Sequence, residues 1–441
     1  MIRESFNRTG LFLLAFALLF FFARPAAAQC PADQPGKTSY TIPEYNAFQA
    51  AANEKDPAQK IKLLDDFVAK FPNSTLLCYV YPAYWDAYNA QKNYAKVLEY
   101  SDKLLAIGEK VPLQDRLKAA YVHSLVLEAA YNPKDPNAKD LLTKGRDDAL
   151  LGLKLLDQYP KPDNMSEAQF ADQVKKPVAI TLNSAGGFAA LQLKDYKSAA
   201  DFYHAAVSAN PTDEVAYYRL GVAYLLEEPA DTMDGLWELA RASALKGPVQ
   251  AQAKDYLRKR ILAYEQPGCD SSADAQVNEM IQLATNSADR PATYTIPSAA
   301  DLDKIRTSSN ILTVLADLKA GGDKAKLTWL AICGAEFPEV VGKVIDLTPG
   351  TDSVELKLYT GATPEEIQAA TTANLDVKVV GQPEAARIQK DDGVRFSGTL
   401  VAYDPDPAFL LHWDKAKVNP EDIPSEKSTG KHTPHKVPPK K

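Results

Sequence analysis

The residues that could carry acid–base chemistry are few and widely spaced in this sequence. The histidines outside the C-terminal tail are His123, His204 and His412, which we place on predicted helix or strand surfaces, far apart in the chain. No Gly-x-Ser-x-Gly nucleophile motif, phosphate-binding loop or His-Glu-x-x-His zinc motif occurs. We therefore expect a protein that is not an enzyme and has no cofactor. A hydrolase with an unrecognised site would need a cluster of acids and histidine in a cleft.

Two stretches could hold a metal ion. Asp404, Asp406 and Asp414 form a local acidic cluster, and cations such as calcium need converging oxygen ligands of this type. The prolines between these acids favour a β-turn instead. His432 and His435 in the tail make at best a weak site. The sequence therefore predicts no metal.

Four cysteines follow the first 28 residues: Cys30, Cys78, Cys269 and Cys333. They allow three pairings, which the sequence does not distinguish. Their spacing fits no metal-site pattern, so we expect disulfides or buried thiols.

The first residues have the pattern of an export signal. Arg3 and Arg8 precede an apolar run, which three alanines follow at 26–28. This pattern predicts a secretory signal peptide over residues 1–28, cut after Ala28. The apolar run is shorter than the about 20 residues that span a bilayer. We expect a periplasmic or secreted protein with no membrane segment after cleavage.

A lipid anchor on Cys30 is the alternative to a free exported protein. The lipidation motif has a small residue directly before the cysteine and usually a leucine three residues before it. Here these positions hold Gln29 and Ala27, so we rank the anchor below the free protein.

The amino-acid composition limits the classes of protein to which this chain can belong. Hydrophobic residues make up 46% of the chain and charged residues 24%, which is ordinary for a globular protein with a full core. The net charge of −7 argues against binding of nucleic acid by the whole chain.

A repeat is visible between residues 180 and 226. Gly187 and Gly221 stand 34 residues apart, and Ala190 and Tyr224 follow them at the same distance. After Gly187 come large and small residues at helical spacing that end at a proline: Tyr196, Ala199, Tyr203, Ala206 and Pro211. This stretch resembles the tetratricopeptide repeat, a helix–turn–helix unit. The resemblance implies a curved helical array that binds a protein or peptide.

Weaker copies of the same unit precede this stretch. Helix pairs are predicted over residues 42–71, 76–108 and 115–159, and a polar helix over 249–264 suits a capping role. We expect one repeat domain over residues 38–265, with about five pairs.

The first helix of each pair would line the inner face of such an array. There we expect the candidate partner-binding residues Tyr81, Tyr84, Tyr88, Tyr218 and Arg219, because aromatic residues and arginine are frequent at binding surfaces. The alternative is that most of the tyrosines are packing residues of the repeat.

Residues 266–336 are expected to form a helical linker region, with helices over 299–320 and 324–334 separated by Gly321-Gly322. From residue 340 the apolar pattern alternates, which predicts about five short strands with a helical insert. The order resembles the oligonucleotide- and oligosaccharide-binding (OB) fold over residues 337–424, where Gly398 would let a strand bend. Residues 425–441 are polar and basic, and we expect a disordered tail that could contact the cell wall.

The predicted barrel is acidic. Residues 337–424 contain 15 acids and eight bases, whereas a phosphate backbone needs a basic surface. The fold class expected is mainly α, an array of helix pairs followed by a small β-barrel. The function expected is a non-catalytic scaffold for a protein or peptide; the alternative is a cell-wall or carbohydrate-binding barrel, which an exposed aromatic pair such as Tyr359 with Trp413 would favour.

Overall fold

The structure is a computed structural model, and it describes residues 40–265, 269–405 and 408–425. Several features predicted from the sequence lie outside these residues: the signal peptide, Cys30, Asp406, and residues 426–441 with His432 and His435. Within the described ranges, no helix has the length and the apolar character needed to cross a membrane.

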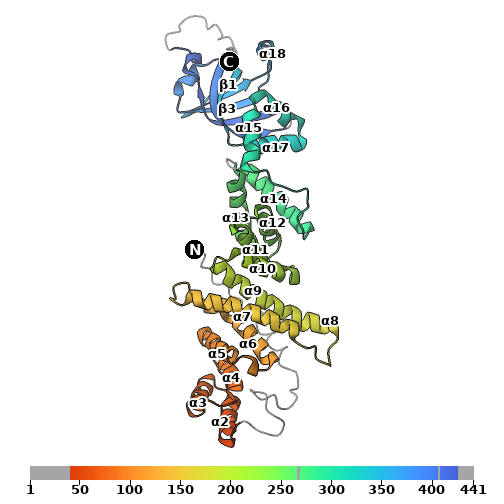
Figure 1. Ribbon diagram of the computed structural model, residues 1–441. Coiled ribbons are helices and arrows are strands. Elements are labelled where there is room, and N and C mark those ends of the chain that lie inside the picture. Colours follow the sequence, from red (N-terminus) through yellow and green to blue (C-terminus); the bar gives the residue numbers. More distant parts are fainter. Residues whose placement is uncertain (1–39, 266–268, 406–407, 426–441) are drawn as a thin grey trace. The chain divides into compact units, whose positions relative to one another are not determined.

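The chain forms two compact units that divide between Val249 and Gln250. The first unit is helical, and each long helix packs against the next one along the chain (Figure 1). Its helices are α2 (Ile42–Asn53), α3 (Pro57–Lys70), α4 (Leu77–Ala90), α5 (Tyr94–Ala106), α6 (Leu113–Ala130), α7 (Ala138–Gln158), α8 (Glu167–Phe170), α9 (Lys176–Gln192), α10 (Tyr196–Ala209), α11 (Glu214–Leu226) and α12 (Thr232–Ala244). The predicted helix pairs are confirmed.

Two turns between paired helices have the same construction. Between α4 and α5 the chain runs Lys92-Asn93, and between α9 and α10 it runs Lys194-Asp195. Both lysines have positive φ, 56° and 63°, and both following side chains cap the next helix. The backbone N–H of Asn93 donates to a carbonyl five residues back, and that of Asp195 does the same to Ala190. The two pairs are therefore local repeats of one structure.

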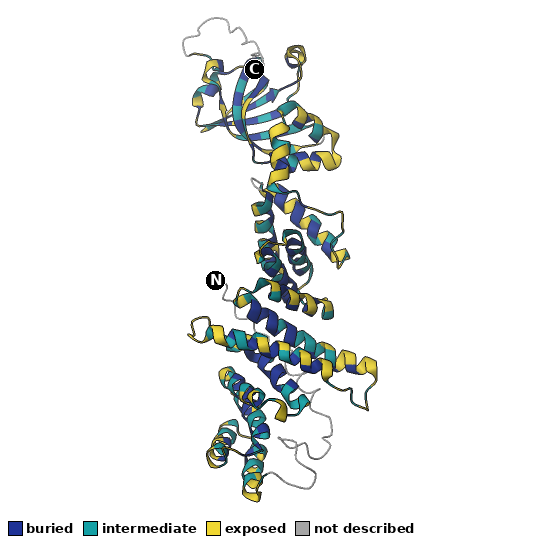
Figure 2. Ribbon diagram, viewed as in Figure 1, coloured by how far each residue is buried: buried dark blue, intermediate teal, exposed yellow. Residues whose placement is uncertain are grey.

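Small residues let the paired helices approach closely. Ala199 and Ala206 of α10 are fully buried. A Cβ atom added at Gly187 would lie 2.9 Å from the ring of Tyr203, and one added at Gly221 would lie 2.8 Å from the carbonyl oxygen of Gly235. Figure 2 shows the resulting burial along α9. Of the other predicted repeat positions, Tyr196 and Tyr224 are half-buried and Pro211 is exposed.

The second unit begins with helices and ends with strands. Its elements are α13 (Gln250–Glu265), α14 (Asp270–Asn286), α15 (Ala299–Ser308), α16 (Ile311–Ala320), α17 (Gly322–Ile332), β1 (Glu336–Pro349), β2 (Ser353–Tyr359), α18 (Pro364–Ala369), β3 (Leu375–Val380), β4 (Gly393–Asp404) and β5 (Leu410–Val418). The sequence analysis assigned residues 250–265 to the repeat domain, whereas α13 groups with this second unit in the structure.

The single helix predicted over residues 299–320 is two helices. Ser309 is extended and ends α15, and Asn310 then caps α16 by accepting hydrogen bonds from the backbone of Leu312 and Thr313. The predicted stop at Gly321-Gly322 is confirmed, because both glycines have a φ of 70°.

The strands close into a barrel in the order β1-β2-β3-β5-β4. Neighbours are antiparallel except β3 and β5, which are parallel. The register of β4 against β5 shifts between Ser397 and Thr399, so β4 is irregular at Gly398, where the sequence predicted a bend.

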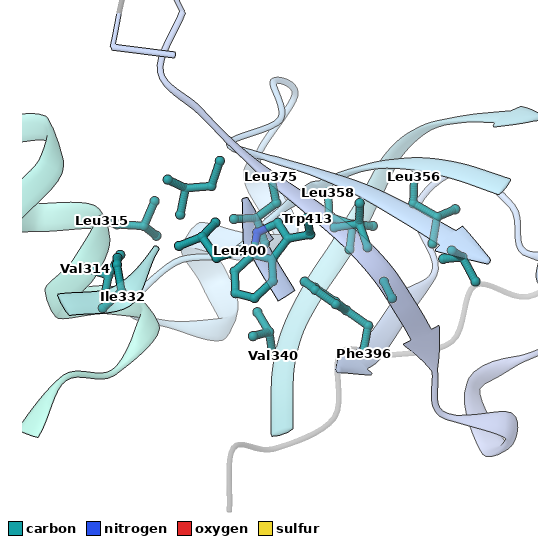
Figure 3. Close-up of a cluster of buried hydrophobic side chains, with 14 of the residues drawn as sticks. Val314, Leu315, Ile332, Val340, Leu356, Leu358, Leu375, Phe396, Leu400 and Trp413 are labelled. Atoms are coloured by element: carbon teal, nitrogen blue, oxygen red, sulfur yellow. The ribbon is translucent and has the colours of Figure 1, made fainter. Parts of the chain in front are cut away.

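One apolar core joins the barrel to the helices before it. Trp413 lies between Phe396 and Leu400 in the barrel interior (Figure 3). Val314 and Ile332, from α16 and α17, belong to the same buried cluster. The helices α15–α17 are therefore part of the barrel's core rather than a separate connection.

Among the described cysteines, Cys269 and Cys333 form a disulfide, and Cys78 is a buried thiol. The bond joins the residue before α14 to the residue after α17, at a sequence separation of 64. This cross-link constrains the helical part of the second unit.

We predict unequal tolerance at the two glycines of the repeat. Gly221→Ala would place a methyl group against backbone atoms, which do not yield, so we expect a loss of about 1–3 kcal/mol in the free energy of unfolding. At Gly187→Ala the nearest atoms belong to the buried ring of Tyr203, a side chain rather than backbone, so we expect a smaller loss. Urea unfolding measures both, with Ser208→Ala as an exposed control on α10. Equal losses would contradict the close approach of α11 and α12.

A second prediction concerns Glu265 at the end of α13, which is buried and accepts a 2.6 Å hydrogen bond from Gln276. Burial raises its pKa to about 7 from the ordinary 4.5, against the opposing effect of that hydrogen bond. The folded state then holds a proton that the unfolded state releases between these values. As pH rises from 4.5 to about 7, the free energy of unfolding of the wild type should fall relative to that of Glu265→Gln. The fall should be up to about 1.4 kcal/mol per pH unit.

Urea unfolding of both proteins at pH 4.5, 6 and 8 tests this dependence. Glu339→Gln, at an exposed position, is the matched control and should follow the wild type. A pH-independent difference between wild type and Glu265→Gln would show that Glu265 ionises normally.

Candidate functional site

The predicted tyrosine surface is partly an internal stack. Tyr84 of α4 is 1% exposed, and its ring stacks on Tyr100 of α5 with 3.9 Å between the centroids. Its hydroxyl donates a 2.6 Å hydrogen bond to Asp65. Tyr84 is thus a packing residue, as the alternative interpretation of the tyrosines proposed. Tyr81 and Tyr88 contact Tyr100 as well, but both remain partly exposed.

Arg219 also makes internal contacts. Its guanidinium donates two hydrogen bonds to the carboxylate of Glu128 on α6, at 3.1 and 2.5 Å, and lies over the ring of Phe188 on α9. These contacts hold α11 to the two preceding first helices of the array. Tyr218, beside it, is half-buried. Among the predicted partner-binding residues, the structure brings the tyrosines of α4 together and places Tyr218 and Arg219 elsewhere.

An apolar hollow lies between two first helices of the array, and we call it the α6 pocket. Its α6 residues stand at helical spacing on one face of the helix. Its lining residues are Gln114, Leu117, Lys118, Tyr121, Tyr159, Pro162, Val174 and Val178. Most of these side chains are apolar, and Gln114 is exposed at the rim. Such a lining suits an apolar side chain from a partner.

The backbone beside the α6 pocket is unusual. Residues Ala171–Lys175 form a π-helix between α8 and α9, and Val174 within it lines the pocket. Short π-helices are rare and occur frequently at functional sites. The sequence analysis did not identify this pocket, because its residues come from three separate segments.

A buried ionic cluster lies between α5, α6 and α7. His123 of α6 is fully buried, and its Nε2 atom lies 3.3 Å from Asp102 Oδ1 and 3.6 Å from Asp148 Oδ2. The ammonium group of Lys144 lies 3.4 Å from the same oxygen of Asp102 and 3.3 Å from that of Asp148. The placement of His123 on a helix surface, predicted from the sequence, is therefore wrong.

Burial sets the ionisation of this cluster. Burial raises the pKa of Asp102 to about 7, although Lys144 opposes the shift. Burial and the charge of Lys144 lower the pKa of His123 to about 3, so the imidazole is neutral at pH 7. Lys144 and Asp148, four residues apart on α7, are a sequence signal that could have indicated an ion pair here. Nothing in the sequence indicated that Asp102 and His123 would join them.

The barrel places its predicted residues differently. Trp413 is 2% exposed in the core, and the hydroxyl of Tyr359 donates a 2.7 Å hydrogen bond to Glu366. Tyr359 and Trp413 therefore do not form the exposed aromatic pair that would favour a carbohydrate-binding barrel. Asp404 bonds His412 at 2.8 Å, and the other ring nitrogen of His412 lies 3.0 Å from Asp376. His204 is exposed on α10, as expected.

Comparison with known proteins gives no family for these surfaces. A scan with models of protein families gives no match, and no curated protein sequence matches the chain.

The packing role of Tyr84 leads to a prediction. Tyr84→Phe keeps the ring and removes the buried hydrogen bond to Asp65, so we expect the free energy of unfolding to fall by about 1–2 kcal/mol. Tyr88→Phe is the matched control, because it removes a hydroxyl from a half-buried ring of the same stack. Thermal unfolding compares the two variants. Equal melting temperatures would contradict a structural bond at Tyr84.

Proposed function

We propose that the protein is an exported, non-catalytic scaffold that binds a peptide segment of a partner protein through its helical unit. The α6 pocket is the observation that carries this proposal. Leu117, Tyr121 and Val178 form an apolar lining between two first helices of the array, which is the face that a helical array uses for partners. The bound segment would insert an apolar side chain there.

The repeat supports this proposal. The tetratricopeptide resemblance rests on the spacing of Gly187 and Gly221, and the matched turns at Lys92-Asn93 and Lys194-Asp195 agree with it. Proteins built from such pairs bind extended peptides or helices on their inner face. Tyr81 and Tyr88 on α4 would extend the contact surface.

The barrel is the accessory docking module of this proposal. Its strand order, with β3 parallel to β5, supports the resemblance to the OB fold. Its acidic composition argues for a protein rather than a nucleic acid at this surface. The burial of Trp413 removes the feature that favoured a glycan.

Export is supported by the disulfide. Bonds such as Cys269–Cys333 persist in oxidising compartments such as the bacterial periplasm. A cytosolic protein would hold these thiols reduced.

Site-specific photo-crosslinking tests the proposal. A photoreactive phenylalanine analogue replaces Gln114 at the rim of the α6 pocket, Lys139 on α7, or Glu355 on the barrel; all three positions are exposed. We expect a defined protein to be captured at position 114 and not at 139, and to be lost when Leu117→Ala accompanies the probe. Capture at position 355 identifies a partner of the barrel.

One combination of results would contradict the proposal. If position 114 captures no more than position 139 while the protein is retained on purified cell-wall polymer, the helical unit is a spacer. The carbohydrate-binding alternative would then replace the proposal.

A further inference from the structure

The buried ionic cluster has the geometry of a metal site. One ligand atom from each of Asp102, His123 and Asp148 lies within 4.8 Å of the others. The Nε2 atom of His123 is 3.3 and 3.6 Å from the two carboxylate oxygens. A tetrahedral zinc ion with bonds of about 2.0–2.1 Å separates its ligand atoms by about 3.3–3.4 Å. The imidazole therefore stands at ligand spacing from both carboxylates.

The same atoms lack hydrogen-bond partners. His123 is fully buried, and among the described residues neither of its ring nitrogens makes a hydrogen bond. Asp102 Oδ1 and Asp148 Oδ2 accept no hydrogen bond within that part of the chain, although each lies in ion-pair distance of the ammonium group of Lys144. Buried polar atoms in folded proteins nearly always have a partner, and an ion is one way to supply it. Three atoms without hydrogen bonds converge on one point, and the ammonium group of Lys144 is the cation that faces the two oxygens in this structure.

The charge of the cluster agrees with this interpretation. Two carboxylates face an imidazole and one ammonium group, so ionisation of both carboxylates leaves one negative charge that Lys144 does not compensate. A divalent cation neutralises both. Calcium and magnesium need more oxygen ligands than are present, whereas one imidazole with carboxylates suits zinc.

We propose that Asp102, His123 and Asp148 bind a zinc ion that links α5, α6 and α7, with Lys144 as the group that the ion displaces. The side chain of Lys144 is 42% exposed, so its ammonium group can leave for solvent without unfolding α7. Water fills the fourth position. The ion crosses between neighbouring helix pairs and so stabilises the array. This inference is independent of the proposed partner binding.

Metal titration of the full chain tests the proposal. Protein freed of metal by a chelator is titrated with Zn²⁺ against a fluorescent zinc indicator, and with Co²⁺, whose tetrahedral complexes absorb strongly in the visible range. We expect one tight equivalent. His123→Gln should weaken it by more than the about 10–100-fold that loss of a supporting residue causes. His204→Gln, at an exposed histidine on α10, is the matched control and should bind normally.

A second variant, Lys144→Met, distinguishes an effect on zinc binding from a folding defect. Removal of the competing ammonium group should tighten zinc binding by at least about tenfold, which a misfolded protein would not do. His412→Gln tests the barrel histidine, which also contacts two carboxylates, and should change nothing.

Two results would overturn the proposal. If the tight equivalent survives in His123→Gln, zinc binds elsewhere in the chain. If neither wild type nor Lys144→Met binds zinc, Lys144 is the permanent cation of the cluster.

Discussion

The helical unit depends on close contact between helices that cannot bury their apolar faces alone. Each pair covers the next, and the contact is close only where the facing residues are small. At Gly221 the approach is so close that backbone of α12 occupies the space of a side chain. At Gly187 a ring of α10 does the same. The array is therefore specified by a few positions of low volume rather than by its largest side chains.

This constraint explains what the sequence predicted well. Small residues at fixed spacing identified the pair α9–α10. The structure adds that the side chains of Asn93 and Asp195 cap the second helices of two pairs. Alternating apolar residues likewise predicted the strands from β1 to β5. These features are local, so periodicity and turn chemistry are sufficient to locate them.

The position of His123 was predicted wrongly because its helix, α6, is buried from several sides. Helix α6 contacts α5, α7 and α9, so it is buried on most of its circumference and shows no clear polar face. A histidine on such a helix has no sequence signal that separates surface from interior, which is why His123 was misplaced. The side of β5 that faces the barrel interior, on which Trp413 lies, was not assigned from the sequence.

Helix α6 contributes residues both to the buried ionic cluster and to the α6 pocket. His123 requires compensation from charged groups on α5 and α7, whereas Leu117 and Tyr121 of the same helix line the α6 pocket. Buried charges are costly to desolvate, so their partners must be held in one geometry, and this geometry fixes the position of α6 between its neighbours. Because Tyr121 and His123 are two residues apart on a rigid helix, the arrangement that satisfies the cluster also sets the shape of the pocket.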